Sequence, residues 1–315
     1  MDKCRRSRII ASLVVLAVFS LLASVAGAAN VTIDCDAGAT IREALRSLKP
    51  GDALLVTGTC KENVVVAAEI LRVTLDGQGK ATIDAQPATA AIAVTGREVT
   101  VKGFTIRGGR NGINVLRGAS ALIDGNTIQQ TGAAGQPGSG LGINVAQHSF
   151  AAIVNNTIQH NPRAGILVHE SSSARIGFAD VASTGHGNTI QNNGREAILL
   201  QRGSTARIVG NTIRNNRGDG ISIEQASQAE IANNVIEQNG GNGIAVTERS
   251  GVNLEIKATG GAGVTVSNRT AVPNAGAGIQ CSIGGYVVGS LGSLTGAKGA
   301  KGFDSTCIDR VLVAP

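Results

Sequence analysis

Residues 188–210 read NTIQNNGREAILLQRGSTARIVG, and residues 211–233 read NTIRNNRGDGISIEQASQAEIAN. The two segments are consecutive, equal in length, and begin with Asn-Thr-Ile, and each has an isoleucine ten residues after the first asparagine. Self-similarity at a short fixed period is the signature of a solenoid, in which each repeat buries its apolar face against the next. This 23-residue unit decides the fold.

The same unit extends outward along the chain. Each copy is anchored on an isoleucine that follows a glycine or an alanine, with a further aliphatic residue ten positions later. The anchors are Ile113, Ile143, Ile166, Ile198, Ile221 and Ile244. Two insertions interrupt the period, one within residues 132–140 and one over roughly residues 177–187. Because the register resumes after each, we expect both to be surface loops.

Apolar residues alternate within each unit, as in Gly220-Ile-Ser-Ile, which is typical of short β-strands. Glycine and β-branched residues dominate, and no 3.6-residue period appears, so helical repeats are disfavoured. The predicted fold is an all-β, right-handed parallel β-helix with three short strands per coil and the isoleucines in interior ladders. Nine or so coils would form a rod roughly 45 Å long.

Two rows of asparagine recur at the predicted turns. Asparagine tolerates left-handed backbone conformations, and stacked side-chain amides can hydrogen-bond from one coil to the next. We therefore interpret both rows as structural. The first row is Asn126, Asn156, Asn211 and Asn234, and the second, in which Thr131 occupies one coil, is Asn161, Asn193, Asn216 and Asn239.

Both ends of a solenoid need caps, because each would otherwise expose the core. The sequence Thr40-Ile-Arg-Glu43 is a capping box that predicts an amphipathic helix before Pro50-Gly51. The segment between Cys281 and Cys307 is too irregular for a coil and is expected to form the second cap. The predicted division is 1–28 signal peptide, 29–60 N-terminal cap, 61–276 coils and 277–315 C-terminal cap.

The N-terminus has the pattern of an export signal. A basic start precedes an apolar run from Ile9 to Ala26, and small residues follow it. The alternative is a membrane anchor, since the run is 18 residues long. Cleavage after residue 28 would remove four basic residues and one acidic residue, so the formal net charge would fall from +6 to +3. That charge is too small to predict a nucleic-acid partner.

Four cysteines remain after cleavage, two near each end. They predict disulfides between Cys35 and Cys60 and between Cys281 and Cys307, in a secreted or periplasmic protein. Zinc binding is the alternative, although no closely spaced cysteine pair or nearby histidine favours it. We expect a monomer with no membrane association after cleavage.

The chain resembles bacterial parallel β-helix repeat proteins of the pectin-lyase-like superfamily. The resemblance lies in the capping helix followed by Pro50-Gly51-Asp52, then in Gly58-Thr59-Cys60, Leu75-Asp76-Gly77 and the Asn-Thr-Ile coils. It covers nearly all of the mature chain and implies the fold. It implies no single activity, because the superfamily contains lyases, hydrolases, epimerases, adhesins and the periplasmic copper-maturation protein NosD.

Known catalytic signatures of the superfamily match poorly. Gly185-His186-Gly187 and Arg207-Ile208 resemble two polygalacturonase motifs, but the paired aspartates are missing and Val209 replaces the expected lysine. The Asp-Pro-His-Asp signature of alginate epimerases and the calcium-binding nonapeptides are also absent. We expect no cofactor, and calcium is not indicated.

Residues at equal offsets from the anchors share a surface column. Glu196 and Asp219 lie on adjacent coils with Arg195 beside them, and His169 is a possible proton carrier, so these four are the candidate catalytic residues. The alternative is a solvent-facing ladder of salt bridges. The candidate glycan-binding residues are Arg163, Gln201, Glu224, Gln159, His160, His186 and Asp180.

Three functions remain open. The first is an exported protein that binds a polysaccharide or cell-surface glycan, or serves as an interaction scaffold. The second is a lyase or hydrolase acting on an acidic polysaccharide; the shortage of aromatic residues argues against a processive enzyme, because Tyr286 is the only Tyr or Trp and lies in the expected C-terminal cap. The third is a NosD-like accessory factor, which a single methionine and four histidines disfavour.

Overall fold

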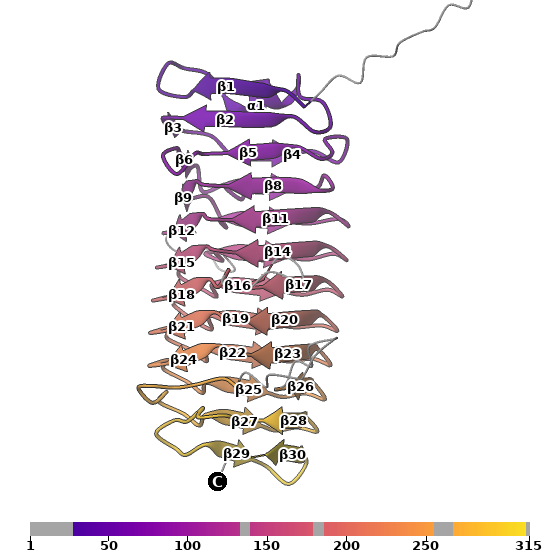
Figure 1. Ribbon diagram of the computed structural model, residues 1–315, viewed down its shortest axis with the longest axis vertical. Helices are drawn as coiled ribbons and strands as arrows, with labels where there is room; N and C mark the ends of the chain where they lie inside the picture. Colours follow the sequence, from indigo (N-terminus) through magenta and orange to yellow (C-terminus); the bar gives the residue numbers. More distant parts are fainter. Residues whose placement is uncertain (1–27, 133–138, 179–185, 255–266, 313–315) are drawn as a thin grey trace, which may run out of the picture.

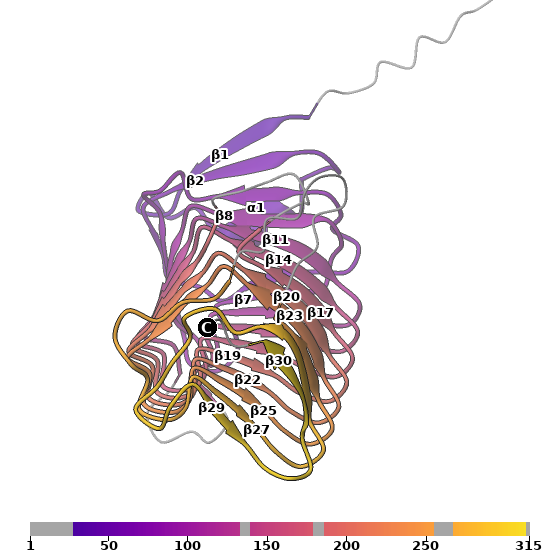
Figure 2. The same cartoon turned by 60° about the horizontal axis from the view of Figure 1, so that its bottom comes forward.

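The computed structural model describes residues 28–132, 139–178, 186–254 and 267–312. Within these ranges the chain winds through three parallel sheets, which we call sheets A, B and C, and each coil contributes to them in turn (Figure 1). The strands stack from β1 at one end to β29 and β30 at the other, so the molecule is an elongated parallel β-helix. Figure 2 shows the coils in near-register behind one another.

Sheet A has twelve strands and is the longest. Its strands are β1 (Asn30–Asp34), β2 (Ala53–Thr57), β5 (Thr74–Asp76), β8 (Val99–Lys102), β11 (Ser120–Asp124), β14 (Phe150–Val154), β17 (Ser173–Ile176), β20 (Thr205–Val209), β23 (Gln228–Ala232), β26 (Gly251–Asn253), β28 (Tyr286–Ser290) and β30 (Ile308–Leu312).

Sheets B and C have eight and ten strands. Sheet B consists of β3 (Thr59–Cys60), β6 (Thr82–Ala85), β9 (Thr105–Gly108), β12 (Thr127–Gln129), β15 (Thr157–Gln159), β18 (Thr189–Gln191), β21 (Thr212–Arg214) and β24 (Val235–Glu237). Sheet C consists of β4 (Val64–Val66), β7 (Ile92–Val94), β10 (Ile113–Val115), β13 (Ile143–Val145), β16 (Ile166–Val168), β19 (Ile198–Leu200), β22 (Ile221–Ile223), β25 (Ile244–Val246), β27 (Ile279–Cys281) and β29 (Lys301–Phe303).

The anchor isoleucines form the predicted interior ladder. They pair in register down sheet C, for example Ile198 with Ile221, and all six anchors are fully buried. Because such a side chain is worth roughly 1.5–3 kcal/mol when buried, the ladder is a principal source of stability.

The predicted length of nine coils was too short. Twelve strands in sheet A correspond to a rod of about 53 Å at the usual strand spacing. The additional coils lie at both ends of the solenoid, and toward the C-terminus Ile279, which follows Gly278, still pairs with the anchor Ile244.

The asparagine rows are buried hydrogen-bond ladders, as predicted. The first row begins at Asn126, whose Oδ1 accepts from the backbone N–H of Phe104 at 3.0 Å. In the following coils each Oδ1 accepts from the backbone N–H and the Nδ2 of the asparagine one coil earlier; Asn211 accepts both from Asn188 at 3.0 and 2.9 Å. The expectation of left-handed asparagines was wrong for the ladder residues themselves. The left-handed conformation belongs to the residue before each of them, such as Asn155 or Gly210, which frees the ladder side chain to point inward.

The N-terminal end is capped by α1 (Ile41–Leu45), as predicted. The Thr40 side chain accepts from the Glu43 backbone N–H at 3.2 Å, and Glu62 accepts from the N–H of Ile41 at 2.7 Å. Buried Ile41 and Leu45 face the core. Glu62 therefore satisfies a backbone N–H of the first helical turn that has no acceptor within the helix.

Both predicted disulfides are present, Cys35–Cys60 and Cys281–Cys307, and they indicate an oxidising compartment. The segment between the last two cysteines differs from expectation, because β28 and β29 continue the ladder there. The stapled end is thus made of coils. The predicted signal peptide lies outside the described residues except for Ala28, and none of the described helices is long and apolar enough to cross a membrane.

Candidate functional site

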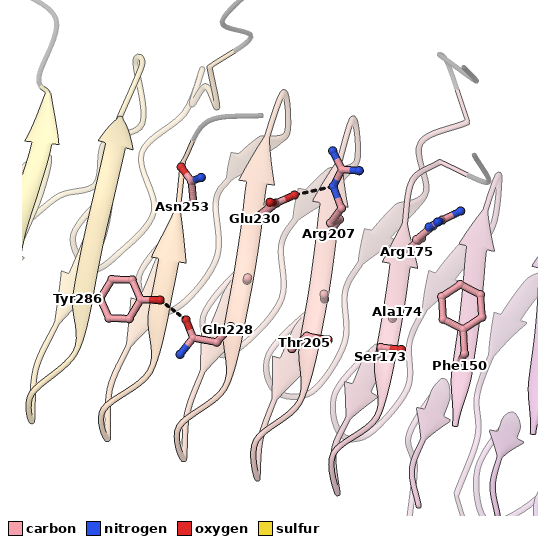
Figure 3. Close-up of a pocket in the computed structure, with 12 residues that line it drawn as sticks. Phe150, Ser173, Ala174, Arg175, Thr205, Arg207, Gln228, Glu230, Asn253 and Tyr286 are labelled. Atoms are coloured by element: carbon pink, nitrogen blue, oxygen red, sulfur yellow. Dashed lines mark hydrogen bonds and ion pairs between the residues drawn. The ribbon is translucent and has the colours of Figure 1, made fainter. Parts of the chain in front are cut away.

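A groove of about 480 Å³ lies on the outer face of sheet A, across strands β14 to β28 (Figure 3). Successive side chains of a strand point to opposite faces, so every second residue of these strands lies in the groove. Two columns result, each with one residue per strand. The first is Phe150, Ser173, Thr205, Gln228, Gly251 and Tyr286, and the second continues from Arg175 through Arg207 and Glu230 to Asn253.

The first column is a shallow trough with an aromatic ring at each end. Ser173 and Thr205 are small, so the floor between the rings is low and carries hydroxyl groups. The Tyr286 hydroxyl donates to Gln228 Oε1, and the ring is 38% exposed. Aromatic faces beside hydroxyl and amide groups are suited to amphipathic ligands.

The second column brings positive charge to one wall. The guanidinium groups of Arg175 and Arg207 lie 6.0 and 5.1 Å from the ring centroid of buried Phe178, and Arg175 also lies 5.8 Å from the Phe150 centroid. Arg207 forms an ion pair with Glu230 at 2.6 Å. These contacts hold the two planar cations in place, one strand apart, where they can bind anionic groups.

The predicted catalytic carboxylates come together on a different face, outside sheet C. Asp219 accepts from the Asn242 backbone N–H and from its Nδ2 at 3.0 Å. Burial raises the pKa of Asp219, and the nearby charges of Glu196 and Glu224 raise it further, against the hydrogen bonds from Asn242. The three carboxylates therefore form one cluster.

Glu196 and Glu224 differ in their hydrogen-bond partners. The Glu196 side chain is 14% exposed, and Oε1 lies 3.5 Å from the Arg195 guanidinium. Its Oε2 has no hydrogen-bond partner among the described residues. Glu224 accepts from Gln201 at 2.9 Å and from Ser222 at 2.8 Å. Predicted residues Arg195, Gln201 and Glu224 thus join the Glu196–Asp219 pair.

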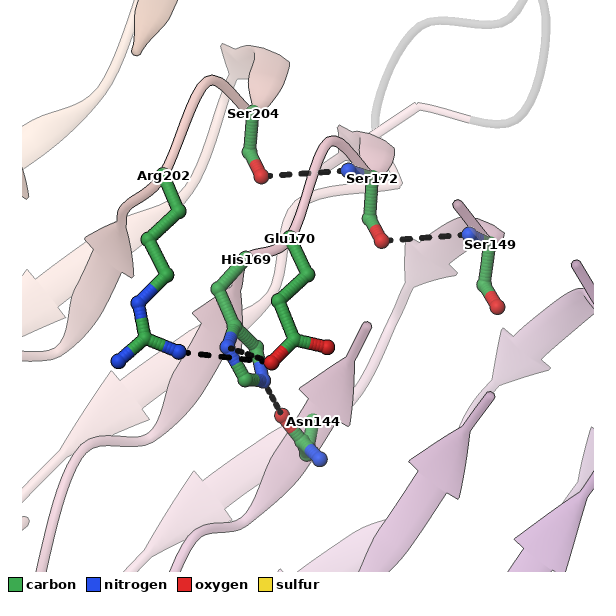
Figure 4. A network of polar contacts seen from close by, with 7 residues as sticks. All are labelled: Asn144, Ser149, His169, Glu170, Ser172, Arg202 and Ser204. Atoms are coloured by element: carbon green, nitrogen blue, oxygen red, sulfur yellow. Dashed lines mark hydrogen bonds and ion pairs between the residues drawn. The ribbon is translucent and has the colours of Figure 1, made fainter. Parts of the chain in front are cut away.

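His169 belongs to a separate network (Figure 4). Its Nε2 lies 3.0 Å from Asn144 Oδ1, and its Nδ1 lies 3.7 Å from Glu170, which also contacts Arg202. Burial lowers the pKa of His169; Glu170 opposes and Arg202 reinforces this shift. Because its polar contacts within the described residues are with this network, His169 is not placed to exchange a proton with Asp219.

The remaining predicted residues are spread over other faces. Gln159 lies in a row of glutamines outside sheet B, bonded to Gln129 at 3.0 Å and Gln191 at 2.9 Å. His160 is exposed at the turn after β15, and His186 contacts Asn155 at 3.3 Å. Arg163 lies half-buried in the turn before β16. Asp180 lies outside the described residues.

One set of three ligand-type side chains lies close enough together to hold a metal among the described residues, Cys35, Cys60 and Glu62. The two cysteines form a disulfide, and Glu62 caps α1. This set therefore does not fit a metal site, because a disulfide sulfur is no thiolate ligand.

The groove is absent from the sequence-based prediction, because the residues seven and nine positions after each anchor were not compared between coils. That comparison brings together Phe150 with the hydroxyl residues and Arg175 with Arg207, so the signal was available. Tyr286 lies seven residues after Ile279, which follows Gly278, so the same offset also leads to this residue. The pairing of β28 with β26 places it in the column.

A family model described as "Right handed beta helix region" matches residues 90–257 and 180–288. No curated protein matches the chain. Three solved structures resemble it over most of its length. An alginate lyase from Paenibacillus sp. str. FPU-7 has 16% identity and a TM-score of 0.54, covering 89% of this chain and 99% of that one.

The other two are epimerases. The A-module of mannuronan C-5 epimerase AlgE4 from Azotobacter vinelandii has 13% identity and a TM-score of 0.51, covering 92% of this chain and 91% of that one. The periplasmic alginate epimerase AlgG has 14% identity and a TM-score of 0.52, covering 91% and 73%. At these identities the likeness concerns the fold.

Proposed function

The chain belongs to the right-handed β-helix family, and from this premise we propose that it is an exported glycan-binding protein that holds a polysaccharide in the groove on sheet A. One observation carries the proposal, the trough between Phe150 and Tyr286 with arginines along its wall. A sugar ring has an apolar face that can stack on an aromatic ring and hydroxyl groups that bind amides and hydroxyls.

The two arginines favour a glycan with acidic groups. Guanidinium groups bind carboxylates in a planar, two-pronged geometry, and Arg175 and Arg207 lie on adjacent strands. Glu230 compensates one of these charges. The names of the similar structures, which include alginate and mannuronan enzymes, are compatible with such a ligand but are properties of those proteins.

Calorimetric titration of the purified protein with polygalacturonate, alginate and a neutral glucan tests this proposal. We expect the acidic polymers to bind and the Arg207→Gln variant to lose at least fivefold in affinity. Arg214→Gln is the matched control, because Arg214 lies on the outer face of sheet B in the same coil. Equal loss in both variants, or no binding of any polymer by the wild type, would contradict the proposal.

A second candidate function is cleavage of an acidic polysaccharide at the carboxylate cluster outside sheet C. The raised pKa of Asp219 beside Glu196 favours it, because acid–base catalysis uses a protonated and an ionised carboxyl group at one site. Unsaturated products absorbing near 235 nm, or new reducing ends, would be lost in Asp219→Asn and Glu196→Gln but retained in Arg207→Gln. Absence of turnover in the wild type leaves the binding function alone.

A further inference from the structure

The two aromatic rings of the groove lie in one column of sheet A. Phe150 pairs with Ser173, and the column continues through Thr205, Gln228 and Gly251 to Tyr286. Five strand steps separate the two residues, which is about 24 Å at the usual spacing. Between them the floor carries no aromatic residue, so the rings form two separate platforms.

Gly251 determines how the Tyr286 ring lies. A Cβ atom built on Gly251 would lie 2.0 Å from Cζ of Tyr286 and 2.2 Å from Cε1. The ring therefore lies across the backbone of β26, and its hydroxyl group reaches Gln228 on β23 (Figure 3). Any larger residue at position 251 would push the ring away from the sheet. The backbone of β26 and the hydrogen bond to Gln228 together fix this platform.

The Phe150 ring is held at the opposite end of the trough. The Arg175 guanidinium lies 5.8 Å from its ring centroid and 6.0 Å from that of Phe178. Arg175 therefore lies against both rings, and this contact holds the Phe150 ring in place. Both platforms are thus oriented before any ligand binds, which lowers the entropic cost of binding.

We propose that the two platforms bind the same extended glycan segment, four to five sugar units long, which runs parallel to the solenoid axis. The Tyr286 ring lies over β26, so its separation from Phe150 along the sheet is about four strand spacings, or roughly 19 Å. With one sugar unit assigned to each strand spacing of about 4.8 Å, this separation corresponds to four to five units. The inference rests on the proposed function and adds the length of the recognised segment and the role of Gly251.

Titration with oligogalacturonates and oligomannuronates of two to eight units tests the inference. We expect affinity to rise at least tenfold between the trimer and the pentamer, where one molecule first reaches both platforms, and to change little from the pentamer to the octamer. Tyr286→Ala and Gly251→Ala should both abolish this step. Tyr286→Phe, which retains the ring but loses the hydrogen bond to Gln228, should weaken the step less than either alanine variant.

The variants distinguish platform loss from misfolding. Gly251→Ala adds an atom where the Tyr286 ring packs, whereas Tyr286→Ala only removes atoms. Far-UV circular dichroism of both variants checks that they fold. Tyr286→Ala then tests the loss of the platform without added crowding. Dimers that bind as tightly as pentamers would overturn the inference while the proposed function stands. A length step that persists in Tyr286→Ala would overturn it too. If no oligomer or polymer binds, the proposed function itself fails.

Discussion

Replacement of Asn211 by alanine tests whether the asparagine ladder contributes to stability. Asn211 is fully buried, and its Oδ1 accepts from the backbone N–H and the Nδ2 of Asn188. Its own Nδ2 donates to the carbonyl oxygens of Ile176 and Val209 and to Asn234 Oδ1, at 3.0 to 3.2 Å. Five hydrogen bonds in the interior therefore depend on one side chain.

The expected loss of stability depends on which hydrogen bonds the partners of Asn211 keep after the replacement. The Nδ2 of Asn188 still donates to the Ile153 carbonyl, and Asn234 still accepts from the Asn211 backbone N–H. The backbone N–H of Asn188 loses its partner, and leaving such a buried donor unpaired costs roughly 1–3 kcal/mol. With the remaining weakened contacts, we expect the free energy of unfolding to fall by about 3 kcal/mol.

Urea unfolding followed by far-UV circular dichroism measures this loss, since the protein has no tryptophan for fluorescence. Asn215→Gly is the control, because Asn215 is exposed and already left-handed, a conformation that glycine adopts freely. It should change stability by less than about 0.5 kcal/mol. A loss below about 1 kcal/mol in Asn211→Ala, or one equal to the control, would refute a stabilising role of the ladder.

Two further predictions concern pH and the disulfide. Because the pKa of Asp219 is raised in the folded state, the folded protein holds its proton more tightly, and stability falls as pH rises through the raised pKa. Wild type should therefore lose stability relative to Asp219→Asn as the pH rises from about 4, the ordinary pKa of an aspartate, through the raised pKa, as urea unfolding would show; a constant difference would contradict this. Replacing both Cys281 and Cys307 by alanine should cost about 3 kcal/mol, because the bridge spans 26 residues of chain. An unchanged unfolding midpoint would show that this disulfide does not stabilise the last coils.

The cluster of Asp219 and Glu196 shows what alignment of the repeats can and cannot predict about a site. The spacing of these residues from the anchors places them on adjacent coils, where the charge of Glu196 raises the pKa of Asp219, and the same alignment includes Gln201 and Glu224. It did not separate His169 from Asp219 and Glu196, although His169 lies three residues after its anchor and these two lie two residues before theirs, because an offset does not show which partners a long side chain reaches. Hydrogen bonds to Asn144 and contact with Glu170 decide that, and both are tertiary contacts.

The sequence by itself determined the repeat, the interior isoleucine ladder, the stacked asparagines, the capping helix and the two disulfides. All of these depend on periodicity or local pattern, which a regular solenoid converts directly into position. The Tyr286 platform required the tertiary structure, because the offset from Ile279 gives the column but not the position of the ring, which lies across β26 and reaches Gln228. Gly251 likewise appears as one glycine among many until the ring packed across it is seen.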